Sequence, residues 1–313
     1  MIRTENLTKM YNGNKAVDSL NLEIAEGDVF GFLGPNGAGK STTILMLVGL
    51  IEPTEGKCII NDIEVVRNPL EVKEFIGYLP ENVGFYGNMT AEQNLDYFAR
   101  FYPIDADERK KRIGELLELV QLDGVSQKVG GYSRGMTQRL GFAQALLNNP
   151  DVIFLDEPTT NLDPEGVLQL RQTLKKLSDE GKTIFFSSHI LAEVAQVCNT
   201  IGIISNGTLI ERGTLDEVKT KLDVRKTVKI IVEATNEDMP KIEHENIINV
   251  EYKGRRAVIE AKTDIREDIS MYLLENNVGI KELRIEEPTL EDVFMESVYK
   301  KPFFKKESFT KET

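Results

Sequence analysis

The segment GPNGAGKST, residues 34–42, is the feature that most constrains how this chain can fold. It fits the pattern G-x-x-x-x-G-K-S/T and lies between an apolar run, VFGFL (29–33), and a helical pattern, TTILMLVGL (42–50). Glycines at this spacing let backbone N–H groups curl around phosphate oxygens, while Lys40 reaches the outer phosphates and Ser41 ligates Mg²⁺. Strand, loop and helix in this order predict a nucleoside triphosphate site. Its candidate binding residues are Gly34, Pro35, Asn36, Gly37, Ala38, Gly39, Lys40, Ser41 and Thr42.

Short apolar runs recur along the chain with helical patterns between them. VIFL (152–155), TIFFSS (183–188) and IGIIS (201–205) are continuous rather than alternating, which is typical of parallel strands covered on both faces. The opening segment, 2–24, alternates more and contains a turn at 12–14, so it favours antiparallel edge strands. We therefore predict an α/β fold of the P-loop NTPase class, with a parallel core sheet, antiparallel edge strands and a helical lobe.

Two acidic residues follow one of these predicted strands. Asp156 and Glu157 come directly after VIFL, and ligands of parallel sheets gather at the carboxyl ends of the strands. Such a pair taken alone is typical of a helix cap, but beside a phosphate loop it favours catalysis. Asp156 is then suited to hold Mg²⁺ through water, and Glu157 to polarise the attacking water. His189 follows another predicted core strand, where a lone histidine is usually structural.

A second segment, GGYSRGMTQRLGFAQALL (130–147), has the features of a helix N-terminus prepared for an anion. Two glycines and a Ser-x-Gly precede its apolar helical run, which places Ser133 and Gly135 at the predicted start of the helix. Free backbone N–H groups and the helix dipole favour negative charge at such a position. The chain therefore carries two candidate anion sites about a hundred residues apart.

Charge and hydropathy exclude several classes of protein. The chain has 38 lysine and arginine residues against 51 aspartate and glutamate residues, a net charge of −13 that argues against nucleic acid as a partner. Its longest apolar run, ILMLVGLI (44–51), is far shorter than the roughly 18 to 20 residues that span a bilayer, and no signal peptide is evident. Cys58 and Cys198 form no metal-binding or disulfide pattern. We therefore expect a cytoplasmic protein.

The pattern changes near Lys221, which predicts two domains, 1–221 and 226–298. The first contains a helical lobe at about 82–147, where TAEQNLDYFARFY begins with a capping box, Thr90 to Gln93. The second has the order βαββαβ, with a short helix around Pro240 and a closing helix at 289–298, and this order predicts a small ferredoxin-like α+β domain. The basic and aromatic tail, 299–313, fits either a disordered end or a contact with a membrane surface or partner.

The order of these motifs over roughly residues 1 to 220 resembles that of the ATP-binding cassette (ABC) ATPases. The resemblance implies that Tyr11 stacks on adenine with support from Val17, and that His189 senses the γ-phosphate. It also implies a head-to-tail dimer, a homodimer or pseudo-dimer, with two ATP molecules at the interface. Each ATP would be held by the phosphate loop of one subunit and by Ser133 and Gly135 of the other. Residues Asn161, Leu162 and Asp163 match the loop that contacts the opposite subunit.

Two positions depart from the pattern of that family. Arg134 stands where the signature sequence has a glycine, and it would add positive charge near a polyphosphate. Glu81, in GYLPEN, stands where the family usually has a glutamine near Mg²⁺ and the attacking water. A carboxylate can still take part in the metal shell, so the candidate Mg²⁺ residues are Ser41, Glu81 and Asp156.

The segments 132–147, 77–90 and 286–298 are similar to those of the ATPase subunits of two-component exporters of the bacitracin- and multidrug-resistance type. That subfamily pairs its ATPase with a separate integral membrane permease, so the resemblance implies an exporter subunit located on the inner face of the cell membrane. ATP would close the dimer, and the lobe, with surface candidates Phe85 and Tyr86, would push on the permease. Two alternatives stay open: an ATPase for copper-site maturation of the nitrous-oxide reductase type, and a soluble ABC ATPase without a transport role.

Overall fold

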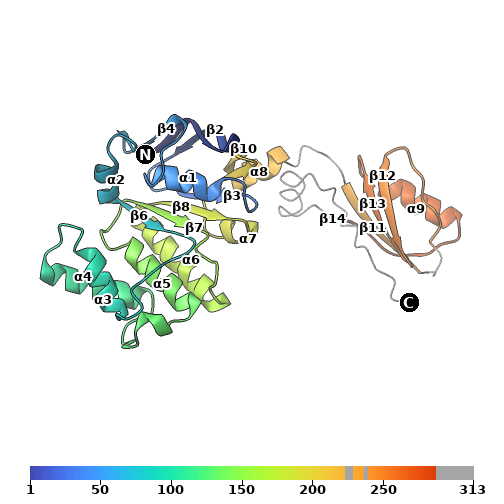
Figure 1. The fold of residues 1–313 in the computed structure, drawn as a ribbon. Coiled ribbons are helices and arrows are strands. Elements are labelled where there is room, and N and C mark those ends of the chain that lie inside the picture. Colours follow the sequence, from blue (N-terminus) through green and yellow to red (C-terminus); the bar gives the residue numbers. More distant parts are fainter. Residues whose placement is uncertain (223–227, 236–238, 287–313) are drawn as a thin grey trace. The chain divides into compact units, whose positions relative to one another are not determined.

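The computed structural model describes residues 1–222, 228–235 and 239–286 of the chain. It divides into two compact units, Met1–Val218 and Lys219–Thr313, which are described separately below (Figure 1). In the described residues, every helix is too short or too polar to cross a membrane.

A six-stranded sheet forms the centre of the first unit, in the order β10-β9-β3-β8-β7-β6. Every neighbouring pair is parallel except β9 and β10, so the predicted parallel core is confirmed. All residues of β3, β7 and β8 are buried, as continuous apolar strands with both faces covered require. The strands are β3 (Val29–Leu33), β6 (Ile76–Leu79), β7 (Val152–Asp156), β8 (Thr183–Ser188), β9 (Thr200–Ser205) and β10 (Thr208–Thr214).

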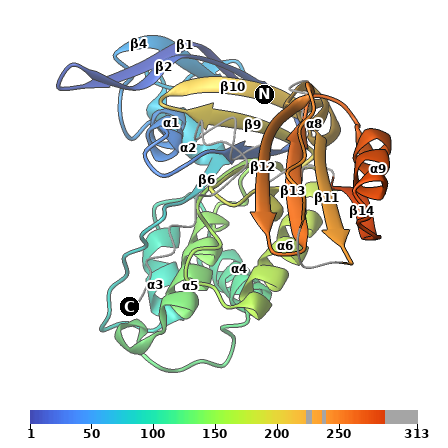
Figure 2. The same cartoon turned by 90° about the vertical axis from the view of Figure 1, so that its right-hand side faces the viewer.

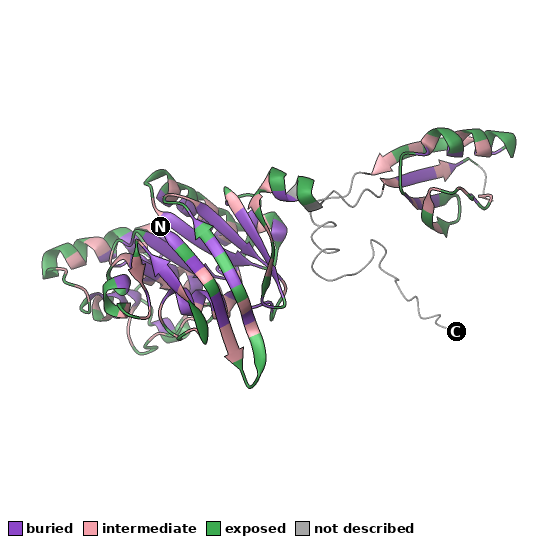
Figure 3. Cartoon of the chain, turned by 90° about the horizontal axis from the view of Figure 1, so that it is seen from above, coloured by how far each residue is buried: buried purple, intermediate pink, exposed green. Residues whose placement is uncertain are grey.

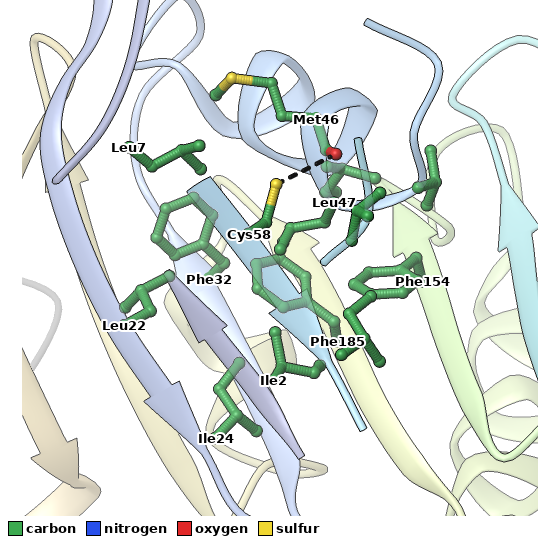
Figure 4. Close-up of a cluster of buried hydrophobic side chains, with 14 of the residues drawn as sticks. Ile2, Leu7, Leu22, Ile24, Phe32, Met46, Leu47, Cys58, Phe154 and Phe185 are labelled. Carbon is green, nitrogen blue, oxygen red and sulfur yellow. Dashed lines mark hydrogen bonds between the residues drawn. The ribbon is translucent and has the colours of Figure 1, made fainter. Parts of the chain in front are cut away.

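The opening segment folds into antiparallel strands, as expected, but its predicted place at the edge of the parallel sheet is wrong, because these strands make a sheet of their own in the order β2-β1-β4-β5. Their alternating apolar residues face the central sheet, so that Leu7, Leu22 and Ile24 lie over Phe32 and Phe185 (Figure 4). These buried side chains join the two sheets and the helix α1 into one core. The elements are β1 (Ile2–Tyr11), β2 (Asn14–Ile24), β4 (Glu55–Ile60), β5 (Ile63–Glu64) and α1 (Lys40–Leu47).

Helices dominate the segment between β6 and β7, where the sequence predicts a lobe. The capping box is formed, because Thr90 Oγ1 accepts from the Gln93 N–H and Gln93 Oε1 accepts from the Thr90 N–H. The central strands β3, β7 and β8 are buried along their whole length (Figure 3), whereas the lobe helix at 106–119 is exposed or half-buried at most of its residues. The lobe comprises α3 (Ala91–Ala99), α4 (Ala106–Leu119) and α5 (Arg134–Ala145); the other helices of this unit are α2 (Pro69–Phe75), α6 (Pro164–Asp179) and α7 (Leu191–Val194), and α8 (Leu215–Leu222) contains the boundary between the two units.

The second unit is an antiparallel sheet in the order β12-β13-β11-β14, the strand order of a ferredoxin-like domain. Helix α9 packs on one face of it (Figure 2). The elements are β11 (Val228–Ala234), β12 (Ile247–Lys253), β13 (Arg256–Ala261), α9 (Arg266–Glu275) and β14 (Ile280–Glu286).

The prediction of a short helix around Pro240 is wrong for the described residues 239–246, because these residues form neither helix nor strand. The Ile242 N–H donates to the Tyr252 hydroxyl (2.7 Å), and the Ile242 side chain is buried in the core of the unit. An irregular segment therefore covers the place that a first helix would take. The predicted closing helix, 289–298, and the basic tail, 299–313, lie outside the described residues.

Candidate functional site

The phosphate loop connects β3 to α1 and depends on glycine at several positions. Gly37 and Gly39 have φ values of +79° and +107°, a region that side chains rarely adopt. A Cβ on Gly39 would lie 2.5 Å from the Ala16 carbonyl oxygen. The loop is fixed to the neighbouring strand by the Gly34 N–H, which donates to the Ser188 carbonyl (3.2 Å). Its backbone is therefore held open around the start of the helix.

Lys40 points into this loop and is 5% exposed. Its Nζ donates to the carbonyl oxygens of Gly34 (2.7 Å) and Pro35 (3.2 Å). The same ammonium lies 3.1 Å from Glu157 Oε1, which balances two buried opposite charges. The lysine that the sequence assigns to phosphates thus contacts the predicted catalytic base.

Glu157 and His189 meet at the carboxyl ends of β7 and β8. His189 Nδ1 lies 2.8 Å from Glu157 Oε2, while the other carboxylate oxygen of Glu157 faces Lys40. Glu157 has a φ of +49°, which turns the chain sharply after β7. Because parallel strands end at one edge, three residues far apart in the sequence come together here.

Asp156 is buried beneath this group, and its Oδ1 accepts from the Ser187 hydroxyl (2.8 Å). Ser187 Oγ in turn accepts from the Glu157 N–H (3.0 Å), so one hydroxyl orders both acids. Burial raises the pKa of Asp156, and hydrogen bonds from Ser187 and Ser41 act in the opposite direction. Sequence reasoning missed Ser187, although its place at the end of an apolar strand beside β7 was a usable signal.

The oxygen atoms near Asp156 fit Mg²⁺ brought in with a nucleotide. Among the described residues, no three His, Cys, Asp or Glu side chains gather to hold a metal by themselves. Mg²⁺ usually keeps several waters and takes one or two carboxylates together with substrate phosphates. The hydrogen bond between Ser41 and Asp156 places two hard oxygen donors at the end of the phosphate loop, which matches that requirement.

A cavity of about 510 Å³ opens over the phosphate loop. It brings together the loop residues with Glu81, Glu157 and His189, so the exposed Glu81 lines the same cavity as the phosphate loop. Ala16 and Thr160 also line it and were not predicted. The full lining is Ala16, Asn36, Gly37, Gly39, Lys40, Ser41, Thr42, Glu81, Glu157, Thr160 and His189.

Other predicted site residues do not line this cavity. Tyr11 lies at the end of β1, 47% exposed, with Lys9 Nζ 5.4 Å from its ring centre, whereas Val17 is fully buried. Gly34, Pro35 and Ala38 are also outside the lining: the carbonyl oxygens of Gly34 and Pro35 accept from Lys40 Nζ, and Ala38 is buried.

Ser133 and Gly135 lie at the start of α5, away from the phosphate loop of the same chain. Ser133 is exposed, and its Oγ accepts from the Met136 N–H (3.2 Å) as the helix cap. A Cβ on Gly135 would lie 3.3 Å from the carbonyl oxygen of Asn161. Asp163 caps α6 by accepting from the Gly166 N–H (2.9 Å). The second candidate anion site thus lies beside the loop at 158–163.

Two family models match the chain. The model described as ABC transporter matches residues 17–160. The model described as ATP-binding protein DrrA1-3-like, C-terminal domain, matches residues 213–298. The first match lies within the unit Met1–Val218, and the second lies mainly in the unit Lys219–Thr313.

Curated relatives and solved structures agree with those models. The bacitracin transport ATP-binding protein BcrA of Bacillus licheniformis is 46% identical over 71% of this chain and 72% of its own length. The linearmycin resistance ATP-binding protein LnrL of Bacillus subtilis (strain 168) is 31% identical over 92% of this chain and 95% of its own. A dimeric structure of the ATP-binding cassette MJ0796 bound to ADP and Pi is 29% identical with a TM-score of 0.64, and the match covers 68% of this chain and 98% of that one.

Proposed function

The chain belongs to the ATP-binding subunits of the ABC transporter family, and we propose that it hydrolyses MgATP in the cavity over residues 34–42 to drive a separate membrane permease. One observation carries the assignment of the cavity. The ammonium of Lys40, the carboxylate of Glu157 and the imidazole of His189 lie within contact distance in it. Together they offer a phosphate ligand, a base and a group that orients the base.

ATP binding in this proposal uses the loop amides and Lys40 for the phosphates, with Tyr11 stacked on adenine and Val17 behind it. Ser41 and Asp156 would hold Mg²⁺, with Glu81 at the edge of its shell, and the ion would neutralise charge on the phosphates. Lys40 must then leave Glu157, because the β- and γ-phosphates attract the same ammonium more strongly than one carboxylate does. Binding of the nucleotide therefore frees the base.

Hydrolysis follows from the freed carboxylate. Glu157 accepts the proton of a water aligned with the γ-phosphorus, the water oxygen bonds to phosphorus, and the bond to the leaving oxygen of ADP breaks. His189 holds the carboxylate through the contact of 2.8 Å at Oε2. Oxygen atoms of the γ-phosphate then lie within reach of this histidine, which is half exposed to the cavity.

A second copy of the chain, or a related ATPase subunit, would complete the site. Ser133 and Gly135 are at an accessible helix start and do not line the cavity over the loop of their own chain, which fits binding of the γ-phosphate in the opposite subunit. Arg134 is exposed beside them and would add a positive charge there. Asp163, in the loop next to them, would then meet the opposite subunit. Turnover should accordingly require a dimer.

The permease would bind the aromatic surface of the lobe, which we define as Tyr86, Tyr97, Phe98 and Phe101. Phe101 and Tyr97 are 74% and 39% exposed, and Phe98 and Phe101 line a groove of about 220 Å³. Apolar side chains in such numbers at a surface indicate a binding site for protein. Phe85 packs edge-on against Phe98, so it supports this surface, while Tyr86 is part of it.

Exporter function is supported by the relatives BcrA and LnrL, whose names concern bacitracin transport and linearmycin resistance. The two alternatives from the sequence, copper-site maturation and an ATPase without a transport role, are not favoured by these relatives. We place the subunit on the cytoplasmic face of the membrane, because that is where a permease-bound ATPase meets ATP.

The decisive variant is Glu157→Gln, which keeps the size of the side chain but removes the base. We expect ATP binding to persist, turnover to fall by at least about a hundredfold, and a dimer to accumulate with ATP in size-exclusion chromatography. Hydrolysis at the parental rate would show that Glu157 is not the base.

Contact with the permease is tested by Phe101→Asp, which should release the subunit from the membrane fraction of its own host. Ile210→Asp, at an exposed apolar residue of β10, is the control and should stay bound.

A further inference from the structure

Glu193, in the short helix α7, joins two segments of the site without lining the cavity. Its Oε2 accepts from the Thr159 hydroxyl (2.7 Å) and from the Ser188 hydroxyl (2.8 Å). Thr159 comes two residues after Glu157, and Ser188 comes directly before His189. Both are hydrogen bonds to a carboxylate, which are stronger than bonds between neutral groups.

Ser188 carries this connection to the phosphate loop. Its Oγ accepts from the Ile190 N–H (3.0 Å), which closes the turn around His189. Its carbonyl oxygen accepts from the Gly34 N–H (3.2 Å) at the first glycine of the loop. One residue therefore fixes the histidine turn to both the phosphate loop and Glu193.

Thr159 carries the connection in the other direction, into the loop at 158–163. The Thr159 side chain is buried, and its carbonyl oxygen accepts from the Leu162 N–H (3.1 Å). The loop ends where Asp163 caps α6. A further contact joins the elements that follow, since the Arg171 guanidinium of α6 donates to the side chain of Gln196 just after α7. Glu193 thus links the loop at 158–163 to the histidine turn, and a separate contact links α6 to the segment after α7.

We infer that Glu193 is a positioning residue for hydrolysis, because its carboxylate fixes the histidine turn relative to the loop at 158–163. This inference rests on the proposed function, in which that loop meets the opposite subunit. Displacement of the loop on dimer closure would move Thr159, and the shared carboxylate oxygen would pass the movement to Ser188 and His189. Closure at the interface and alignment of Glu157 by His189 would then occur together.

Three substitutions separate this role from a general loss of stability. Glu193→Ala removes both contacts and should lower kcat by about tenfold or more, with the Kd for ATP changed less than about twofold because no cavity residue is altered. Thr159→Val removes one contact at constant volume and should lower kcat in the same way. The double variant should be no slower than Glu193→Ala, because both changes break one connection. Glu193→Gln keeps an oxygen acceptor and should restore most of the rate.

Glu217→Ala is the matched control, because the Glu217 carboxylate also accepts a hydrogen bond from a threonine, the Thr214 N–H (2.9 Å), while neither residue lines the cavity. It should hydrolyse ATP at the parental rate. The inference is overturned if Glu193→Ala keeps the parental kcat, if the two losses multiply, or if Glu193→Gln is as slow as Glu193→Ala. A parental chain that binds ATP without hydrolysing it would instead refute the proposed function itself.

Discussion

Lys40→Ala tests the charge balance of the free site. The Lys40 and Glu157 side chains are 5% and 9% exposed and lie 3.1 Å apart. Without the ammonium, the carboxylate stays buried, with His189 as its remaining partner on the cavity side. We therefore expect Lys40→Ala to destabilise the nucleotide-free protein as well as to weaken ATP binding.

The size of the effect follows from the burial of the pair. Removing one partner of a buried ion pair typically costs about 3–5 kcal/mol. His189 is half exposed and already contacts Glu157, so we expect the lower end, about 3 kcal/mol. Adding Glu157→Gln to Lys40→Ala removes the unpaired charge. The double variant should therefore regain roughly two thirds of the lost free energy of unfolding, whereas two independent destabilising changes would add to a larger loss.

Urea denaturation of the nucleotide-free full-length variants measures these free energies. In a thermal scan, 3 kcal/mol corresponds to a midpoint lower by about 6 to 12 °C for a unit of this size. Lys111→Ala is the control, since Lys111 and Glu115 pair at 3.8 Å on the surface, where ion pairs contribute little. The reasoning is refuted if Lys40→Ala is as stable as the parent, or if the double variant is less stable than Lys40→Ala.

Two further predictions concern the same site. Burial raises the pKa of Asp156, so the ionised carboxylate opposes folding at neutral pH; Asp156→Asn should raise the free energy of unfolding at pH 7 while abolishing Mg²⁺-dependent hydrolysis. This gain should shrink as the pH falls through the raised pKa, and equal urea midpoints of parent and variant at pH 7 would contradict it. Gly39→Ala should lower the free energy of unfolding by more than the about 2 kcal/mol expected from its φ alone, since its Cβ would meet the Ala16 carbonyl. Gly37→Ala has open space around its Cβ, so its free energy of unfolding should fall only by the amount expected from its φ. Equal losses in the two variants would refute the steric argument.

Local patterns in the sequence were sufficient to predict the core of the fold. The glycine spacing around Lys40 needs only its neighbours along the chain to form, and continuous apolar strands need burial on both faces wherever they lie. The strand order of the second unit also followed from its pattern, although the helix expected around Pro240 did not form in the described residues. There the Ile242 N–H donates to the Tyr252 hydroxyl and the Ile242 side chain is buried, so the segment gains a hydrogen bond and apolar contacts without forming a helix.

The sequence by itself determined the phosphate loop and the acids and histidine that follow parallel strands, because strand ends of a parallel sheet share one edge. Only the tertiary structure decided how these groups are connected. The contacts of Ser187 with Asp156 and Glu157, and of Glu193 with Thr159, are hydrogen bonds between residues 30 to 34 apart in the sequence. Such bonds form through single hydroxyl and carboxylate oxygens whose positions no periodicity of the sequence encodes, since packing of the sheet and helices places them.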